Sequence, residues 1–147
     1  MLDSAGPHGG FIVVGVDGSE GSKEALRWAD RQAGLTGAKL KLVHSWVFPP
    51  NYGVVASYPA EFDPEGESKR MLEHTVAEVL GEDRLSTVEL SVMEGHPASV
   101  LTRQAKGADL LVVGHRGHGG FGGMLLGSVS RHCVAHSTSP VVVVRGG

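Results

Sequence analysis

The stretch Leu110-Leu-Val-Val-Gly-His-Arg-Gly-His-Gly-Gly-Phe-Gly-Gly-Met-Leu-Leu-Gly-Ser-Val-Ser130 joins a short apolar run to a loop in which seven of the 14 residues from Gly114 to Gly127 are glycine. The apolar run is typical of a buried parallel strand, and Gly127-Ser128 favours the start of a helix. Glycine lets anion oxygens approach the main chain, and a helix N-terminus presents N–H groups to them. The stretch therefore predicts a phosphate-binding loop between a strand and a helix.

Strands and helices are predicted to alternate along the rest of the chain. Apolar and β-branched runs predict strands, and apolar residues at helical spacing predict helices. Residues 88–92 alternate between apolar and polar, which predicts a strand with one exposed face near the edge of the sheet. Five strands alternating with four helices indicate a single-domain α/β fold with a doubly wound parallel sheet, covering residues 11–147 after a flexible tail at 1–10. Residues 47–63 are predicted to form a long loop that acts as a lid. The predicted strands are 11–17, 40–46, 88–92, 110–113 and 140–145, and the predicted helices run from Ser19 to a stop at Gly34, then over 64–80, 97–107 and 128–136.

Composition excludes several classes of partner. The 147 residues carry a formal net charge of −3, with a pI near 6.2 and no run of lysine or arginine, which argues against nucleic acid. No segment approaches the roughly 18 apolar residues that a membrane span requires. A single cysteine, Cys133, cannot form an internal disulfide, and no signal peptide is recognisable. The expected location is the cytoplasm.

The predicted topology brings separate parts of the chain to one crevice. Ligands of doubly wound sheets bind at the carboxyl ends of the strands, where the winding reverses. If the first and fourth strands are neighbours there, Asp17, Ser45 and the loop from Gly114 face the same crevice. No Asp or Glu follows Asp109, so a polyanion meets little repulsion from that half of the site. One nucleotide is expected to fill the crevice.

These motifs resemble a known family. The pattern Gly114-x-x-Gly117, nine further residues and Gly127-Ser128 is similar to the ATP-binding signature of the universal stress proteins. The resemblance extends over almost the whole chain, through residues 13–19, 42–44, 95–97 and 139–144. It implies a Rossmann-like fold of the adenine nucleotide alpha hydrolase type with strand order 3-2-1-4-5. It also implies ATP as the ligand, with or without Mg²⁺.

The resemblance assigns a role to each matched position. Asp17 and the backbone near Ser45 would hold the adenine end, with the strand ends Gly15, Val16 and Val113 beside them. Ribose and phosphate would lie against Gly114, Arg116 and Gly117, while Gly127, Ser128, Val129 and Ser130 close on the phosphates. The departure from the family pattern is the glycine-rich insert 118–123, which affects the rigidity of the loop.

The sequence shows no catalytic apparatus. No Gly-Lys-Ser/Thr of a Walker A loop is present, and no serine or cysteine has a histidine and a carboxylate fixed by a motif. His132 and His136 stand four apart on a predicted helix, but no third ligand of suitable spacing completes a metal site. No metal ligand is therefore expected from side chains. Asp17 has a second possible role as a cap for the helix that begins near Ser19.

The pattern predicts an ATP-dependent switch in the stress response, with at most weak ATP hydrolysis and a protein partner that the sequence does not identify. The alternatives are slow hydrolysis or autophosphorylation, binding of cyclic AMP or another adenine nucleotide, and a dimerisation module with an empty pocket. Residues 141–145 form an apolar strand that the implied order places at an edge of the sheet. An open apolar edge requires a cover. The resemblance implies a homodimer through this strand, and the alternative cover is a loop or the N-terminal tail.

Overall fold

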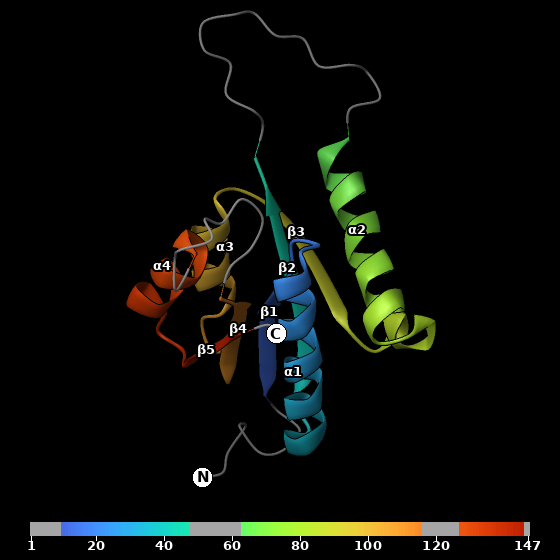
Figure 1. Cartoon of the computed structure of the whole chain (residues 1–147), viewed down its shortest axis with the longest axis horizontal. Helices are drawn as coiled ribbons and strands as arrows, with labels where there is room; N and C mark the ends of the chain where they lie inside the picture. Colours follow the sequence, from blue (N-terminus) through green and yellow to red (C-terminus); the bar gives the residue numbers. More distant parts are fainter. Residues whose placement is uncertain (1–9, 48–62, 116–126, 146–147) are drawn as a thin grey trace, which may run out of the picture.

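A computed structural model describes residues 10–47, 63–115 and 127–145 of the chain. A five-stranded sheet has the order β3-β2-β1-β4-β5, and every neighbouring pair is parallel (Figure 1). This order and the alternation of strands with helices confirm the predicted fold. The elements are β1 (Phe11–Gly15), α1 (Glu20–Thr36), β2 (Lys39–Trp46), α2 (Pro64–Val79), the 3-10 helix η1 (Glu82–Ser86), β3 (Glu89–Glu94), α3 (Pro97–Gln104), β4 (Leu110–Gly114), α4 (Ser128–His136) and β5 (Val141–Val144).

Side chains of the central strand alternate between two apolar cores. Ile12 and Val14 pack with residues of α1 and α2, whereas Val13 packs with residues of α3 and α4. The alternation follows from the two-residue period of a strand. Figure 1 shows α1 in front of the sheet, with α2 beside it and with α3 and α4 grouped together. Because both faces of the sheet are covered, β1, β4 and β5 consist almost entirely of apolar residues, whereas β2 and β3 also contain polar ones.

Helix α1 begins as predicted and ends three residues later than predicted. The Ser19 side chain accepts a hydrogen bond from the Ser22 N–H, which caps the first turn. Gly34 was expected to stop the helix, and this prediction is wrong: the helix continues to Thr36, and Gly37 ends it in the left-handed conformation (φ 78°). An isolated glycine inside a helix is tolerated at a cost of roughly 1 kcal/mol, whereas the left-handed cap favours glycine strongly.

Other boundaries differ by a few residues. Strand β1 ends at Gly15 rather than at Asp17, although the Val16 N–H still donates to the Val43 carbonyl. Helix α3 ends at Gln104, and residues 105–107 form a turn before β4. The 3-10 helix η1 had no counterpart in the sequence prediction. Among the described residues, no helix is long and apolar enough to cross a membrane.

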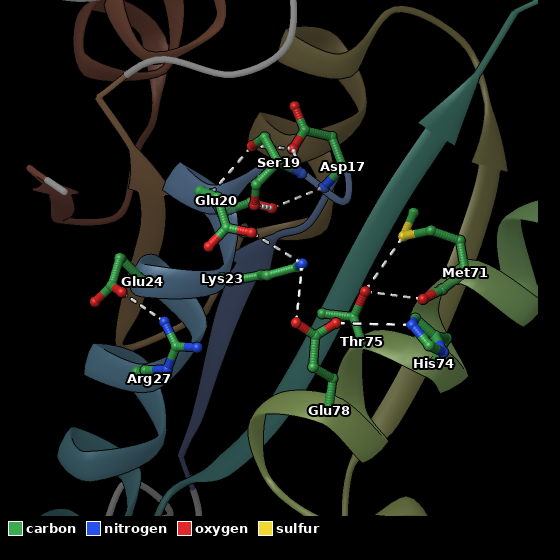
Figure 2. A network of polar contacts seen from close by, with 11 residues as sticks. Asp17, Ser19, Glu20, Lys23, Glu24, Arg27, Met71, His74, Thr75 and Glu78 are labelled. Atoms are coloured by element: carbon green, nitrogen blue, oxygen red, sulfur yellow. Dashed lines mark hydrogen bonds and ion pairs between the residues drawn. The ribbon is translucent and has the colours of Figure 1, made fainter. Parts of the chain in front are cut away.

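Ion pairs link α1 to α2 and to η1. The Lys23 ammonium donates to Glu20 in its own helix and to Glu78 in α2, each at 3.1 Å (Figure 2). These hydrogen bonds raise the pKa of Lys23. Further along α1, the Arg84 guanidinium of η1 donates to both carboxylate oxygens of Asp30, at 2.7 and 3.2 Å. The end of α1 that carries Ser19 is thus tied to the helix that follows residues 48–62.

Candidate functional site

A pocket lies at the carboxyl ends of β1, β2 and β4. It holds about 590 Å³ of space, the open solvent at its mouth included. Strand β1 is the centre of the sheet: the chain proceeds from it to β2 on one side and later returns to β4 on the other. The pocket therefore lies where the winding reverses, as predicted for ligands of such sheets. The lining residues are Gly15, Val16, Asp17, Ser19, Ser22, Val43, His44, Ser45, Pro97, Leu101, Val113, Gly114, Gly127, Val129 and Ser130.

Asp17 shapes the turn between β1 and α1. One of its carboxylate oxygens accepts hydrogen bonds from the Ser19 N–H and the Ser19 hydroxyl (Figure 2). The Asp17 N–H donates to the Ser22 hydroxyl at 3.2 Å. Gly18 adopts the left-handed conformation (φ 82°) that this tight turn requires. The carboxylate thus supports the start of α1, which was the alternative role, and it also lies in the pocket lining.

His44 fixes the neighbouring strand end. Its Nδ1 lies 2.7 Å from the Val16 carbonyl oxygen, which can only accept a hydrogen bond. Nδ1 must therefore carry the hydrogen, and this contact orients the imidazole ring. Together with the bond from the Val16 N–H to the Val43 carbonyl, it joins the ends of β1 and β2 at the wall of the pocket.

Packing requires a glycine at the end of β4 and favours one at the end of β1. A Cβ on Gly114 would lie 2.8 Å from the Gly21 carbonyl oxygen, which is closer than a real Cβ approaches backbone. A Cβ on Gly15 would lie 2.9 Å from Leu101 Cδ1, the end of a side chain that can move. Gly114 therefore lets the end of β4 meet the start of α1. Gly15 lets α3 approach β1 beneath the pocket.

Helix α4 begins at the pocket without a side-chain cap. Its N-cap residue is Gly127, whose N–H donates to the His115 carbonyl at 2.6 Å. The Ser130 hydroxyl, which is buried, donates to the carbonyls of His115 (3.0 Å) and Gly127 (3.1 Å). The first N–H groups of a helix have no partner within it, so the amides of Ser128, Val129 and Ser130 remain to be satisfied from outside. An anion at this end would receive those amides and the positive end of the helix dipole.

The lining is mainly apolar and carries little charge. Among the described lining residues, Asp17 is the only one with a formal charge, and it lies at the β1 end rather than at α4. Within the same described ranges, no group of three or more His, Cys, Asp or Glu residues could hold a metal ion. The pocket therefore offers an apolar slot for a flat group between β2 and α3, and main-chain amides for an anion at α4.

Nine of the predicted site residues lie in this lining, one described residue does not, and two lie outside the described residues. Ser128 is exposed and lies outside the lining, so its hydroxyl does not face the pocket. Arg116 and Gly117 lie outside the described residues, as do residues 48–62 of the predicted lid. The nine are Gly15, Val16, Asp17, Ser45, Val113, Gly114, Gly127, Val129 and Ser130.

Sequence reasoning missed six lining residues. Ser19 and Ser22 form the capped turn of α1, where a serine indicates a helix start but gives no sign of a pocket. Pro97 and Leu101 come from α3, and only the packing of that helix under the strand ends brings them in. Val43 and His44 immediately precede Ser45, so the predicted convergence of strand ends could have identified them.

The doubly wound parallel sheet with a pocket at its switch point defines a Rossmann-like α/β protein. The sequence profile of the universal stress protein family matches residues 11–145, and the chain belongs to this family. A universal stress protein of Mycolicibacterium smegmatis is 38% identical over an alignment of 156 positions, which covers 99% of this chain and 51% of that relative. The chain thus spans about half the length of that relative.

Solved structures of universal stress proteins share the fold. One, in complex with cAMP, is 28% identical with a TM-score of 0.63, over 92% of this chain and 95% of that one. Another, from Archaeoglobus fulgidus in complex with dAMP, is 23% identical with a TM-score of 0.58, over 91% of this chain and 96% of that one.

Proposed function

We propose that the pocket binds an adenine nucleotide, with ATP as the physiological ligand. The observation that carries the proposal is the uncapped start of α4 at one end of an apolar pocket at the switch point of the sheet. The base would lie toward β2 and α3, and the phosphates would accept hydrogen bonds from the amides of residues 128–130. Asp17, at the β1 end, is suited to a ribose hydroxyl or an adenine amino group because it is a hydrogen-bond acceptor away from the phosphates.

The comparisons support an adenine nucleotide in general. Two solved family members are complexes with cAMP and dAMP, both of which carry adenine and a single phosphate. The choice of ATP rests on the glycine pattern from Gly114 to Ser128, which resembles the ATP-binding signature. Main-chain amides recognise any phosphate, so cAMP is the alternative ligand that the first of these complexes favours.

Nucleotide binding is proposed to act as a switch. The described lining holds no lysine, and the one serine in it that donates to a carboxylate, Ser19, caps helix α1. Binding energy is therefore available to shift the population of conformations rather than to drive a reaction. The glycine loop connects His115 to Gly127, two residues that are hydrogen-bonded at its base. Occupancy of the pocket would change the surface at this loop that is presented to a protein partner in the stress response.

The proposal includes a homodimer that works in the cytoplasm. Strand β5 pairs with β4 along one side, and no described strand pairs with its other side. Its four valines make an open edge that is prone to pair with another strand. A second copy of β5 related by a two-fold axis would cover both edges at once. The single described thiol, Cys133, is buried, which suits a reducing compartment but does not require one.

Calorimetric titration of the purified protein with ATP, ADP, AMP, cAMP and GTP tests the proposal. We expect a dissociation constant in the micromolar range for at least one adenine nucleotide and weaker binding of GTP. Absence of binding by every adenine nucleotide up to millimolar concentration would overturn the proposed function. A parallel assay for phosphate release from ATP with Mg²⁺ identifies the enzymatic alternative, because a pure switch shows no turnover.

A further inference from the structure

One polar side chain in the pocket has no partner. The hydroxyl oxygen of Ser45, on β2, is buried, and no hydrogen bond reaches it from any part of the chain that the structure describes. Buried polar groups are nearly always hydrogen-bonded, because removal from water without compensation costs free energy. A hydroxyl in this state within a pocket lining indicates a group that is satisfied by something the pocket binds.

The strand geometry directs Ser45 to the apolar side of the pocket. Side chains two apart on a strand lie on the same face, so Ser45 shares the face of Val43. Val43 packs in the core that contains Leu101 and Val113, both of which also line the pocket. His44 lies on the opposite face, where its ring contacts the Val16 carbonyl. The Ser45 hydroxyl is therefore a polar group beside an otherwise apolar slot.

The position of β2 separates this hydroxyl from the phosphate end. Strands β2 and β4 flank β1, so their ends lie two inter-strand spacings apart, roughly 10 Å. A nucleotide with its phosphates on α4 would bring its base, not its phosphates, to β2. An apolar slot suits a flat aromatic ring, and a single hydroxyl in it can hydrogen-bond one nitrogen at the edge of the ring.

We propose that the Ser45 hydroxyl hydrogen-bonds the purine base directly and is a specificity-determining group of this site. The inference rests on the proposed function and adds a side-chain contact to it. A serine hydroxyl can donate to a ring nitrogen or accept from the exocyclic amino group of adenine. A site that contains such a group discriminates against a base that lacks the matching atom, because the hydroxyl then stays buried without a partner.

The proposal predicts opposite effects of Ser45→Ala on the stability of the empty protein and on its affinity for a nucleotide. In the empty protein the substitution removes an unsatisfied hydroxyl, so the melting temperature is expected to stay the same or rise. In the complex it removes a hydrogen bond, so adenine nucleotide affinity is expected to fall roughly 3- to 10-fold. A serine with a merely structural role would instead lower the melting temperature of the empty protein.

The experiment measures melting temperature and calorimetric affinity for wild type, Ser45→Ala, Ser45→Thr and Ser91→Ala. Ser45→Thr keeps the hydroxyl on a residue suited to a strand and should retain most of the affinity. Ser91 lies on β3, pairs with Val43 and is outside the lining, so Ser91→Ala is the matched control and should bind like wild type.

Base analogues locate the contact. Wild type and Ser45→Ala are titrated with ATP, 7-deaza-ATP, 1-deaza-ATP and purine riboside triphosphate, which lack N7, N1 and the amino group respectively. One analogue should lose affinity on wild type by about the same factor as Ser45→Ala loses for ATP. The same analogue should show no further loss on Ser45→Ala, because the hydrogen bond is already absent.

The outcomes distinguish a failure of the proposed function from a failure of the inference about Ser45. If wild type binds no adenine nucleotide, the proposed function fails and this inference fails with it. If wild type binds ATP while Ser45→Ala binds it equally well, only the inference is overturned. A lower melting temperature of empty Ser45→Ala with unchanged affinity would likewise overturn it, because it shows that the hydroxyl has a partner within the protein.

Discussion

At the scale of single residues, the main-chain carbonyl of His115 explains how the glycine loop is closed. It accepts hydrogen bonds from the Gly127 N–H and from the Ser130 hydroxyl. Gly127 and Ser130 were both predicted to contact phosphate, but these two donors are already hydrogen-bonded within the protein. Gly127 contributes mainly through its missing side chain, which leaves the next amides uncapped. The sequence pattern identifies residues that line the pocket, but it does not identify the donor that each of them offers.

Gly114→Ala is expected to destabilise the protein by about 1–3 kcal/mol. The added Cβ would lie 2.8 Å from the Gly21 carbonyl oxygen, and relief requires a shift of β4 against α1. Gly34→Ala is the matched control, because a Cβ there meets nothing within 4 Å. It should stabilise helix α1 by about 0.5–1 kcal/mol. Urea unfolding of both variants measures these effects. Unchanged stability of Gly114→Ala would show that the glycine serves the ligand rather than the packing.

Cys133 predicts a loss of stability at alkaline pH. Burial raises the pKa of its thiol to about 11, from 9.0 in the unfolded chain. Between these values the unfolded state releases the proton and the folded state keeps it, so the free energy of unfolding decreases as pH rises. Below pH 9 both states are protonated and this contribution is constant. Urea unfolding of wild type and Cys133→Ala at pH 8, 9 and 10 should show the steeper decline in wild type. Parallel declines would contradict the assignment.

At the scale of elements, the sequence predicts the kinds and order of the elements better than their ends. Apolar runs identify the strands at the centre of the sheet because burial on both faces leaves few polar residues in them, whereas β3 was identified by its alternation of polar and apolar residues. The end of α1 is missed because Gly34 and Gly37 look alike in sequence, and only backbone conformation distinguishes them. Helix η1 is missed because its five residues include no buried side chain and so have no apolar pattern.

Part of the pocket lining is also predictable from the sequence, because it depends on topology alone. Strand ends converge by topology alone, so Asp17, Ser45 and Gly114 could be placed together from the sequence. Pro97 and Leu101 could not, because their position depends on how closely α3 approaches β1 over Gly15. The motif assigned Ser128 to the phosphate site, yet its side chain is exposed. Only its main-chain amide, at the start of α4, is suited to the proposed contact with phosphate.

Two substitutions at Ser128 separate its amide from its hydroxyl. Proline is favoured at the first position of a helix, and Gly127 already has the extended conformation (φ −71°, ψ 167°) that precedes proline. Ser128→Pro should therefore keep α4 intact while it removes one amide donor. We expect nucleotide affinity to fall roughly 10- to 100-fold, as for a hydrogen bond to a charged group.

Ser128→Ala is the matched control, because it keeps the amide and removes only an exposed hydroxyl. Its affinity should stay within about twofold of wild type, since an exposed hydroxyl outside the pocket makes no buried hydrogen bond. Calorimetry measures affinity, and circular dichroism checks that both variants are folded. Equal affinities of Ser128→Pro and wild type would show that the start of α4 does not bind the phosphates.

At the scale of the whole molecule, the centre of the sheet and its β5 edge have different properties. The centre of the sheet, where β1 lies between β2 and β4, contains the pocket. At one edge, β5 has a hydrogen-bonded neighbour on only one side among the described strands. Both properties follow from a single topological choice, the return of the chain across β1 after β3. The proposed nucleotide at the centre and the proposed second copy at the edge would therefore occupy separate parts of the sheet.

The proposed dimer can be tested with proline, because the two sides of β5 use different residues. The carbonyls of Pro140 and Val144 accept hydrogen bonds from Leu111 and His115, on the β4 side. Main-chain groups alternate along a strand, so Val142 also faces β4, whereas Val141 and Val143 face the open edge. Val143→Pro therefore removes an outward N–H and leaves the pairing with β4 in place.

Val143→Pro is expected to convert the dimer to a monomer in sedimentation velocity, with little change in the circular dichroism spectrum and preserved nucleotide binding. Val142→Pro is the matched control: it removes an N–H that faces β4, so it should lower the melting temperature. A dimer that persists in Val143→Pro would show that the copies associate through another surface. A wild-type monomer at every concentration would instead mean that the edge is covered from within the chain, by a segment outside the described residues.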